Sequence, residues 1–273
     1  MGAAVGGCLT AAGHRVLWAS EGRGPDTAAR ASHAGLTDVR TARQVAAEAD
    51  VIVSVCPPHA ALDVAWVVHG FTGLYLDANA IAPATAREVA QLITGSGGRY
   101  ADGGIIGPPP TSAGTTRLYL SGPHAAEVRA LFAGTALEPR VVAGPDTAAS
   151  AVKMAYAAWT KGSSALLLTA RALAKAEGVE EALLAEWALS QPKLADQVTR
   201  AAVAGVTKGW RWVGEMEEIA QTMAGAGLPD GFHQAAAEVY RRCPRTPGTS
   251  GTQAVDVVLA ALTGSERAEQ GQS

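Results

Sequence analysis

The chain has 273 residues, of which 48% are hydrophobic and 17% charged, and its formal net charge is −3. This weakly acidic composition gives no reason to expect a nucleic acid or an anionic membrane as a partner. No apolar run is long enough to cross a bilayer and no signal peptide opens the chain, so we expect a cytoplasmic protein. The three isolated cysteines, Cys8, Cys56 and Cys243, predict neither disulfides nor a metal site.

The chain opens with a pattern that is typical of the second half of a βαβ unit. Residues 3–12 are predicted to form a helix, Gly13 ends it, and residues 14–19 are predicted to form a strand. The strand that should precede this helix is missing, and so are the first glycines of a G-x-G-x-x-G phosphate-binding turn. Gly2 would be the last of those three glycines. We therefore expect a dinucleotide-binding protein whose first strand is absent, through either a misassigned start or a genuine truncation.

Strands and helices alternate up to Gly144, which predicts a Rossmann-type parallel α/β sheet in residues 1–144. The next segment, residues 145–263, is predicted to be an all-helical substrate and dimerisation domain, and residues 264–273 a flexible tail. The predicted strands are residues 51–55, 74–77, 99–102, 117–121 and 139–143, and the predicted helices are residues 83–93, 125–132, 146–177, 180–190, 194–204, 215–224, 233–243 and 254–262.

Three strand ends carry unusual residues, and ligands bind at the carboxyl ends of parallel strands. Val55, Pro57 and Pro58 follow one strand and are predicted to lie against a cofactor. Asn79 follows the next and offers both a donor and an acceptor. The third end carries four predicted substrate-binding residues: Asp102, Gly103, Gly104 and Gly107.

The residue that ends the second strand of a Rossmann unit reads the adenosine ribose. Here Ser20 and Arg23 are suited to a 2′-phosphate, whereas Glu21 between them favours the free ribose diol. Two favourable groups against one predict NADP rather than NAD, with NAD as the alternative.

Lys153 lies near the start of the long predicted helix, in otherwise apolar surroundings, with Tyr156 one turn later on the same face. An amine in such surroundings releases its proton more readily, which suits a general acid/base. A lysine that extends to solvent is the alternative. The helix also carries more apolar surface than one small domain covers, at Met154, Trp159, Leu166, Leu167 and Leu173, which predicts a homodimer.

Together these segments resemble the β-hydroxyacid dehydrogenase superfamily, which includes 6-phosphogluconate and 3-hydroxyisobutyrate dehydrogenases, over roughly residues 1–243. Met1-Gly2 matches the end of its G-x-G-x-M-G motif. The segments 49–58, 77–83 and 102–107 match its fourth strand, its D-x-N-T-x-x-P segment and its substrate loop. Residues 144–153 resemble G-x-G-x-x-x-K, so the resemblance implies that Lys153 is the catalytic acid/base.

Two departures bear on the substrate. Ile106 stands where the superfamily has a substrate-loop serine, and Tyr156 stands where it has an asparagine, which favours a bulkier or less polar substrate. The sequence predicts an NAD(P)-dependent dehydrogenase or reductase that moves hydride between the nicotinamide and a small hydroxylated or carbonyl compound, acting on CH–OH donors. Lys153, Asn79 and Tyr156 are its predicted catalytic residues. The alternatives are an imine reductase, with Tyr156 as proton donor, and a non-catalytic nucleotide-binding protein.

Overall fold

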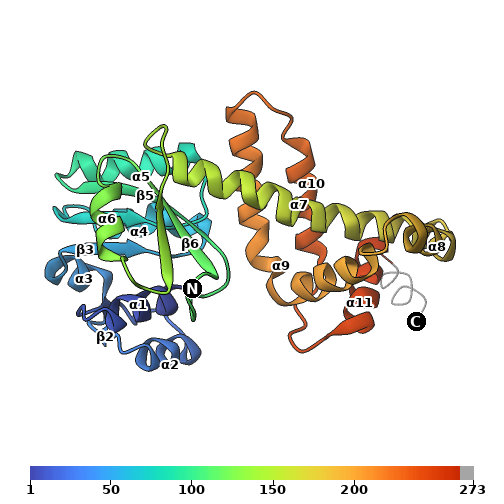
Figure 1. Cartoon of the computed structure of the whole chain (residues 1–273), viewed down its shortest axis with the longest axis horizontal. Helices are drawn as coiled ribbons and strands as arrows, with labels where there is room; N and C mark the ends of the chain where they lie inside the picture. The colour runs from blue at the N-terminus through green and yellow to red at the C-terminus, as the bar shows by residue number, and fades with distance from the viewer. Residues whose placement is uncertain (265–273) are drawn as a thin grey trace. The chain divides into compact units, whose positions relative to one another are not determined.

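The computed structural model describes residues 1–264, in two compact units, Met1–Met154 and Ala155–Ser273 (Figure 1). The first unit holds all the strands of the described residues, and the second is helical. The boundary between the units falls within the long helix α7 (Ala148–Ala176). This arrangement confirms the predicted fold class, an α/β sheet region followed by a helical region. The predicted tail, residues 264–273, lies outside the described residues except for Gly264.

Five strands form the main sheet in the order β3-β4-β5-β6-β7. Strands β3, β4 and β5 are parallel, but β6 runs antiparallel to β5, so the sheet is mixed rather than wholly parallel. The physical reason is the short connection: residues 107–115 are too few for the crossover that a parallel pair needs. The strands are β3 (Val51–Ser54), β4 (Leu74–Asp77), β5 (Arg99–Ile106), β6 (Thr116–Ser121) and β7 (Leu137–Val141).

A second, two-stranded sheet pairs β1 (Leu17–Trp18) with β2 (Thr37–Asp38) in parallel. Among the described residues no strand joins this small sheet to β3. Helix α1 (Gly2–Ala11) begins directly at the first residues, and Gly13 follows it with a φ of 90°, as the predicted helix stop requires.

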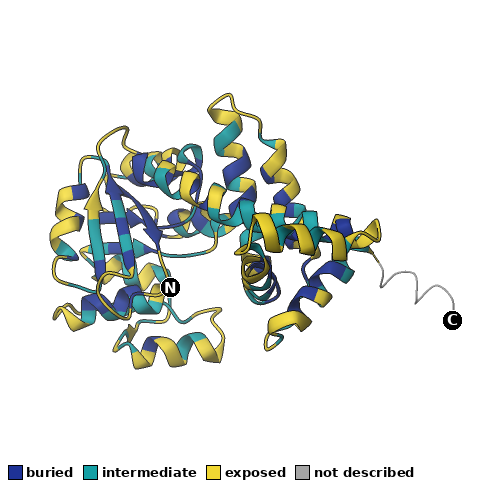
Figure 2. Ribbon diagram, turned by 45° about the vertical axis from the view of Figure 1, so that its right-hand side comes forward, coloured by how far each residue is buried: buried dark blue, intermediate teal, exposed yellow. Residues whose placement is uncertain are grey.

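Helices cover both faces of the main sheet, because successive side chains of a strand point to opposite faces. Leu74 and Leu76 of β4 pack with α1 and α6 (Ala125–Leu131), whereas Tyr75 between them packs with α4 (Ala61–Val67) and α5 (Pro83–Gly95). Figure 2 shows the resulting buried strands between exposed outer helix faces. The remaining elements of this unit are α2 (Pro25–His33), α3 (Ala42–Glu48) and the short η1 (Pro58–Ala60).

In the helical unit, α9 (Leu194–Gly225) is one continuous helix, so the prediction of two separate helices at 194–204 and 215–224 is wrong. Its interior glycines have a packing role, since a Cβ at Gly205 would lie 3.2 Å from the Cys243 sulfur of the segment that ends α10. The other helices are α8 (Glu180–Ser190), α10 (Gly231–Arg242) and α11 (Gly251–Thr263). None of the helices in residues 1–264 has the length and hydropathy needed to span a membrane.

Candidate functional site

The three predicted strand ends lie side by side in the sheet. Ser54 of β3 is in register with Asp77 of β4, and Asp77 is in register with Asp102 of β5. All three side chains are buried. The polar residues that the sequence places after separate strands therefore form one continuous row across the sheet. The third strand does not end at Asp102 as predicted but continues to Ile106.

Asn79 joins two of these strand ends through its side chain. Its amide oxygen accepts a hydrogen bond from the backbone N–H of Cys56 at 2.6 Å, and its amide nitrogen donates to the Ser54 hydroxyl at 3.0 Å. Its backbone N–H donates to the Asp77 carboxylate at 2.9 Å. Because Asn79 is only 2% exposed, its main effect in this structure is to fix the loop after β3.

Cys56, in the loop after β3, and Arg23 line the same pocket. Burial raises the pKa of the Cys56 thiol to about 11, and the positive charge of Arg23 acts in the opposite direction with a smaller effect. The thiol therefore stays protonated near neutral pH. Arg23, which the sequence predicts as a phosphate ligand, lines the same pocket as Val55 and Cys56 at the end of β3.

Arg23 also lines a pocket of about 540 Å³ that runs between β1 and β3. Gly2 and Val55 line the same pocket, and a Cβ on Gly2 would lie 3.8 Å from the Val55 Cβ. Helix α1 begins here without a side-chain cap and without an acidic residue in its first turn. Its first backbone N–H groups and its dipole therefore favour an anion, as a dinucleotide phosphate requires. Gly2, Arg23 and Val55, predicted separately, are brought together and fit such a group.

Ser20 hydrogen-bonds to Asp38, a residue that the sequence analysis did not select. The Asp38 carboxylate accepts from the backbone N–H of Arg40 at 2.8 Å, and this bond, followed by one from Ser20, lowers the pKa of Asp38. Arg40 has a φ of 70°, which is uncommon for a residue with a side chain. The only signal in the sequence was the position of Asp38 at the end of a second short strand, with Arg40 just after it, and that strand was not predicted.

Asp102 holds three segments together. One oxygen of its carboxylate accepts from the Ser121 hydroxyl at 2.9 Å and from the Ser150 backbone N–H at 2.8 Å, and the other accepts from the Ser150 hydroxyl at 2.5 Å. The Ser121 hydroxyl in turn accepts from the backbone N–H of Ala149 at 2.9 Å. Two unpaired N–H groups in the first turn of α7 are thus satisfied from β5 and β6. Burial raises the pKa of Asp102 despite these hydrogen bonds.

Close packing at Gly104 brings α7 onto the sheet, and neighbouring Gly103 packs against β4. A Cβ at Gly104 would lie 2.7 Å from the Ala149 carbonyl oxygen and 3.0 Å from the Lys153 Cβ. At Gly103 it would lie 2.8 Å from the carbonyl oxygen of Asp77. Both contacts are too short for any side chain, so these glycines are required for packing. Lys153, which is half-buried, therefore begins directly above β5, beside the Asp102 network.

Four predicted site residues lie apart from this arrangement. Gly107 follows β5 in the turn toward β6, where a Cβ would lie 2.5 Å from the Thr115 carbonyl oxygen. Pro57 is exposed, and Pro58 begins η1. Tyr156, one turn after Lys153 on α7, is 47% exposed. Their predicted roles stay predictions.

The helical unit contains a buried ion pair between Lys161 of α7 and Glu215 of α9. The Lys161 ammonium lies over the Trp212 ring, 5.2 Å from its centroid. The Tyr240 hydroxyl of α10 donates to the Lys161 carbonyl oxygen at 2.6 Å. These contacts join three helices, and Glu215 is buried between them.

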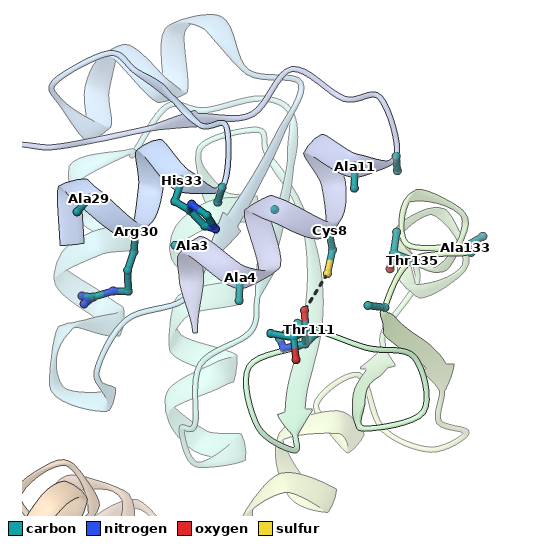
Figure 3. A pocket seen from close by; sticks show the side chains of 16 residues that line it. Ala3, Ala4, Cys8, Ala11, Ala29, Arg30, His33, Thr111, Ala133 and Thr135 are labelled. Carbon is teal, nitrogen blue, oxygen red and sulfur yellow. Dashed lines mark hydrogen bonds between the residues drawn. The ribbon is translucent and has the colours of Figure 1, made fainter. Parts of the chain in front are cut away.

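A wider pocket of about 910 Å³ lies along another face of α1 (Figure 3). Its wall is formed largely by the small side chains of α1, with Arg30 and His33 of α2 beside them. The Cys8 thiol donates to the Pro110 carbonyl oxygen at 3.7 Å within this wall. None of the predicted catalytic residues lines it.

Comparisons with known proteins support the fold described above. The family described as "Domain of unknown function (DUF1932)" matches residues 174–243. The chain is similar to the conserved protein MTH1747 of unknown function, whose structure was described as similar to 3-hydroxyacid dehydrogenases. The identity is 25% and the TM-score 0.63, over 88% of this chain and 93% of that one. No curated protein matches the chain in sequence.

Two further solved structures share the fold. Mycobacterium tuberculosis 3-hydroxyisobutyrate dehydrogenase is 19% identical, with a TM-score of 0.66 over 98% of this chain and 96% of that one. A reductive aminase from Aspergillus terreus, in complex with NADPH and ethyl-5-oxohexanoate, is 20% identical, with a TM-score of 0.54 over 93% and 94%. Together the matches confirm the resemblance to the β-hydroxyacid dehydrogenase superfamily.

The Asp102 network predicts a distinctive effect of pH on stability. Because the folded state raises the pKa of this carboxyl above its ordinary value of 3.8, folding favours the protonated acid. This contribution is fully present below pH 3.8 and is lost as the pH rises through the raised value. Asp102→Asn resembles the neutral acid. Its amide oxygen can accept from the Ser121 hydroxyl and the Ser150 N–H, and its amide nitrogen can donate to the Ser150 hydroxyl, so we expect it to remove this part of the pH dependence.

Asp102→Ala is the matched comparison, because it leaves the buried backbone N–H and hydroxyl of Ser150 without their acceptor, whereas the Ser121 hydroxyl keeps the Asp146 carbonyl oxygen. We expect it to lower the free energy of unfolding by about 1–3 kcal/mol. Urea denaturation of both variants and the parent, from pH 3.5 to pH 7.5, measures both effects. Equal destabilisation by Asn and Ala at every pH would show that the carboxyl is ionised in the folded protein.

Proposed function

We propose that the chain is an NAD(P)-dependent oxidoreductase that transfers hydride between a nicotinamide cofactor and a small hydroxylated or carbonyl compound. The observation that carries the proposal is the placement of Lys153 directly above β5, where Gly104 admits its helix and Asp102 anchors it. The fold that the chain shares with a 3-hydroxyisobutyrate dehydrogenase supports this choice of chemistry.

In this proposal Lys153 takes the hydroxyl proton of an alcohol as it is oxidised, or returns it when a carbonyl is reduced. The nicotinamide, when bound, accepts or donates the hydride. Asp102 is fully buried, so it positions the helix that carries Lys153 instead of contacting the substrate. Asn79 likewise holds the loop after β3, against which the cofactor would lie. Tyr156 and the Gly107 turn remain proposed substrate-binding groups.

The proposed cofactor is NADP, with NAD as the alternative. The uncapped start of α1 at Gly2, the Val55 backbone and the Arg23 guanidinium would hold its phosphates. Arg23 and Ser20 favour a 2′-phosphate, whereas Glu21 and Asp38 add negative charge nearby. The NADPH bound by the reductive aminase supports a phosphorylated cofactor for this fold.

Two alternatives have observations of their own. The similarity in fold to a reductive aminase favours an imine reductase, in which Tyr156 would supply the proton. The interruption between β1 and β3 favours a non-catalytic nucleotide-binding protein. A substrate panel of 3-hydroxy acids, ketones and cyclic imines, read by nicotinamide absorbance, separates the two enzymatic candidates. Cofactor binding without turnover on any of them would favour the third.

We further propose that the protein is a homodimer formed through the helical unit. Three large apolar side chains of α7, at intervals of seven residues, are largely exposed: Trp159 at 76%, Leu166 at 55% and Leu173 at 61%. A seven-residue interval places them in one stripe along the helix, which is the pattern of a helix–helix contact.

The first test concerns the proposed acid/base. We expect Lys153→Ala to lower turnover by about 10²–10⁴, the usual contribution of a general acid or base, while cofactor affinity changes only a few-fold. Lys175→Ala, at the far end of the same helix, is the matched control and should leave both unchanged. Turnover of Lys153→Ala above half the parent rate would rule out the assignment.

The second test concerns cofactor choice. Because Arg23 would pair with the 2′-phosphate, Arg23→Ala should weaken NADP binding roughly 10- to 100-fold, the scale of one charged hydrogen bond, with little effect on NAD. Titration calorimetry with both cofactors measures this, and Arg129→Ala of α6 serves as an exposed-arginine control. Tighter binding of NAD by the parent, or equal weakening of both cofactors, would contradict the preference.

The third test is the oligomeric state. Sedimentation equilibrium at micromolar concentration should give twice the 27.8 kDa chain mass. Leu166→Glu places a charge in the centre of the α7 stripe and should shift the protein to the monomer, whereas Leu62→Glu, exposed on α4, should not. A monomeric parent would refute the homodimer.

A further inference from the structure

Two arginine side chains lie against the same exposed tryptophan ring in the helical unit. The guanidinium carbon of Arg211 is 4.7 Å from the centroid of the Trp210 ring, and that of Arg245 is 4.6 Å from it. The two positive charges therefore lie no farther apart than twice the longer of these distances. Both arginines are exposed, and Trp210 is 42% exposed, so a ligand from solvent can reach all three side chains.

The packing of α10 on α9 brings these two arginines together. Arg211 belongs to α9, and a Cβ on Gly209, two residues earlier, would lie 3.5 Å from the Cβ of Cys243 at the end of α10. Arg245 follows Cys243 after a single residue, Pro244, whose ring fixes its own backbone φ. The segment that carries Arg245 is therefore held on α9 by close helix packing.

In the part of the chain that the structure describes, neither of these guanidinium groups pairs with a carboxylate. Other arginines nearby do: Arg241 pairs with Glu217 at 2.9 Å, and Arg242 pairs with Glu238 at 2.9 Å. Two like charges beside one ring repel each other. An anion bound to both guanidinium groups would offset that repulsion.

The surroundings of the ring add positive charge. Lys208 lies one turn before Arg211 on α9 and is exposed. One turn after Arg211, the same helix carries Glu215, but this carboxylate is buried and paired with Lys161. The local charge is therefore positive, although the formal net charge of the chain is −3.

Arginines in this arrangement suit a phosphate group. A guanidinium that lies over an aromatic ring contacts it through its flat face, so its in-plane N–H groups stay available for hydrogen bonds. Those N–H groups match the geometry of phosphate oxygens and bind them in pairs. Because the ring already holds both side chains, less side-chain freedom is lost when an anion binds.

We propose that Arg211, Arg245 and Trp210 form a binding site for a phosphate ester. The two guanidinium groups would donate to its phosphate oxygens, and the indole ring holds both arginines in place. The site uses none of the residues assigned to the proposed oxidoreductase activity, so it does not depend on that activity.

Nuclear magnetic resonance of the tryptophan indole N–H groups in the full chain tests the proposal, with inorganic pyrophosphate as the probe at constant ionic strength. We expect a saturable shift of the Trp210 signal with a dissociation constant of about 1 mM or lower, the scale of two charge-assisted hydrogen bonds. Arg211→Gln and Arg245→Gln should each weaken this binding by about tenfold or more. Arg200→Gln, at an exposed position of the same helix, is the matched control and should leave it unchanged.

Trp210→Leu separates a built site from a diffuse positive surface, because it keeps both charges and removes the ring that holds them. We expect it to weaken pyrophosphate binding, measured from the side-chain N–H signals of Arg211 and Arg245. Unchanged affinity in this variant would overturn the proposal. The indole signal of Trp187 in α8 should be the same in every variant, which shows that the helical unit is folded in each.

Two further outcomes would contradict the proposal. A shift at Trp18, which lines the pocket between β1 and β3, without one at Trp210 would place pyrophosphate in the candidate cofactor site instead. Succinate, which carries two carboxylates, should bind more weakly than pyrophosphate by about tenfold or more, because it lacks the tetrahedral phosphate oxygens. Equal affinity for succinate would overturn the assignment to phosphate.

Discussion

A buried carboxyl group at Asp102 is the interaction on which the candidate site depends. A carboxyl in the core is tolerated only when its oxygens are hydrogen-bonded, and here the partners come from β6 and from the first turn of α7. The same bonds satisfy N–H groups that the start of α7 would otherwise leave unpaired. The Asp102 side chain therefore has partners for its own buried oxygens and also pairs an N–H group at the start of α7. These bonds fix where the long helix begins.

The position of Lys153 follows from that anchor. It lies one turn after Ser150, so its Cβ reaches β5 at a point set by the Asp102 bonds. Gly104 completes the arrangement, because any side chain there would push α7 away from the sheet. The backbone that carries the amine is thus held by close packing and by a network that needs no ligand. Such pre-organisation is what a general acid/base requires.

The sequence predicted elements where local pattern and tertiary role agree. Strand β4 and helix α8 have the predicted bounds. Predictions of element ends were wrong where glycine serves packing rather than a turn: β5 continues through Gly103 and Gly104, and α9 continues through Gly205 and Gly209. Helix α3 was missed although its Thr41 and Gln44 form a capping box, a pattern visible in the sequence.

The sequence predicted which residues belong to the site better than it predicted the contacts between them. Strand ends in a parallel sheet must meet at one edge, so the row from Ser54 to Asp102 follows from the order of the strands. The bonds of Asn79 to Ser54 and Cys56 depend on the register of β3 against β4, which no local pattern specifies. For that reason Asn79 read as a ligand-binding group, whereas in the structure both ends of its amide are bonded within the protein.

Different interactions hold the two parts of the candidate site, the residues that follow β1 and Lys153 of α7. A two-stranded sheet with two residues in each strand has little stability of its own, so β1 and β2 depend on the helices around them. Helix α1 packs closely against this small sheet, because a Cβ on Gly6 of α1 would lie 3.0 Å from Leu36, just before β2. Ser20 and Arg23, which follow β1, are therefore positioned through helix packing. Lys153 is positioned through buried hydrogen bonds to the main sheet. A change at the β1 edge should thus alter cofactor binding before it alters the acid/base, because no bond of the Asp102 network passes through β1.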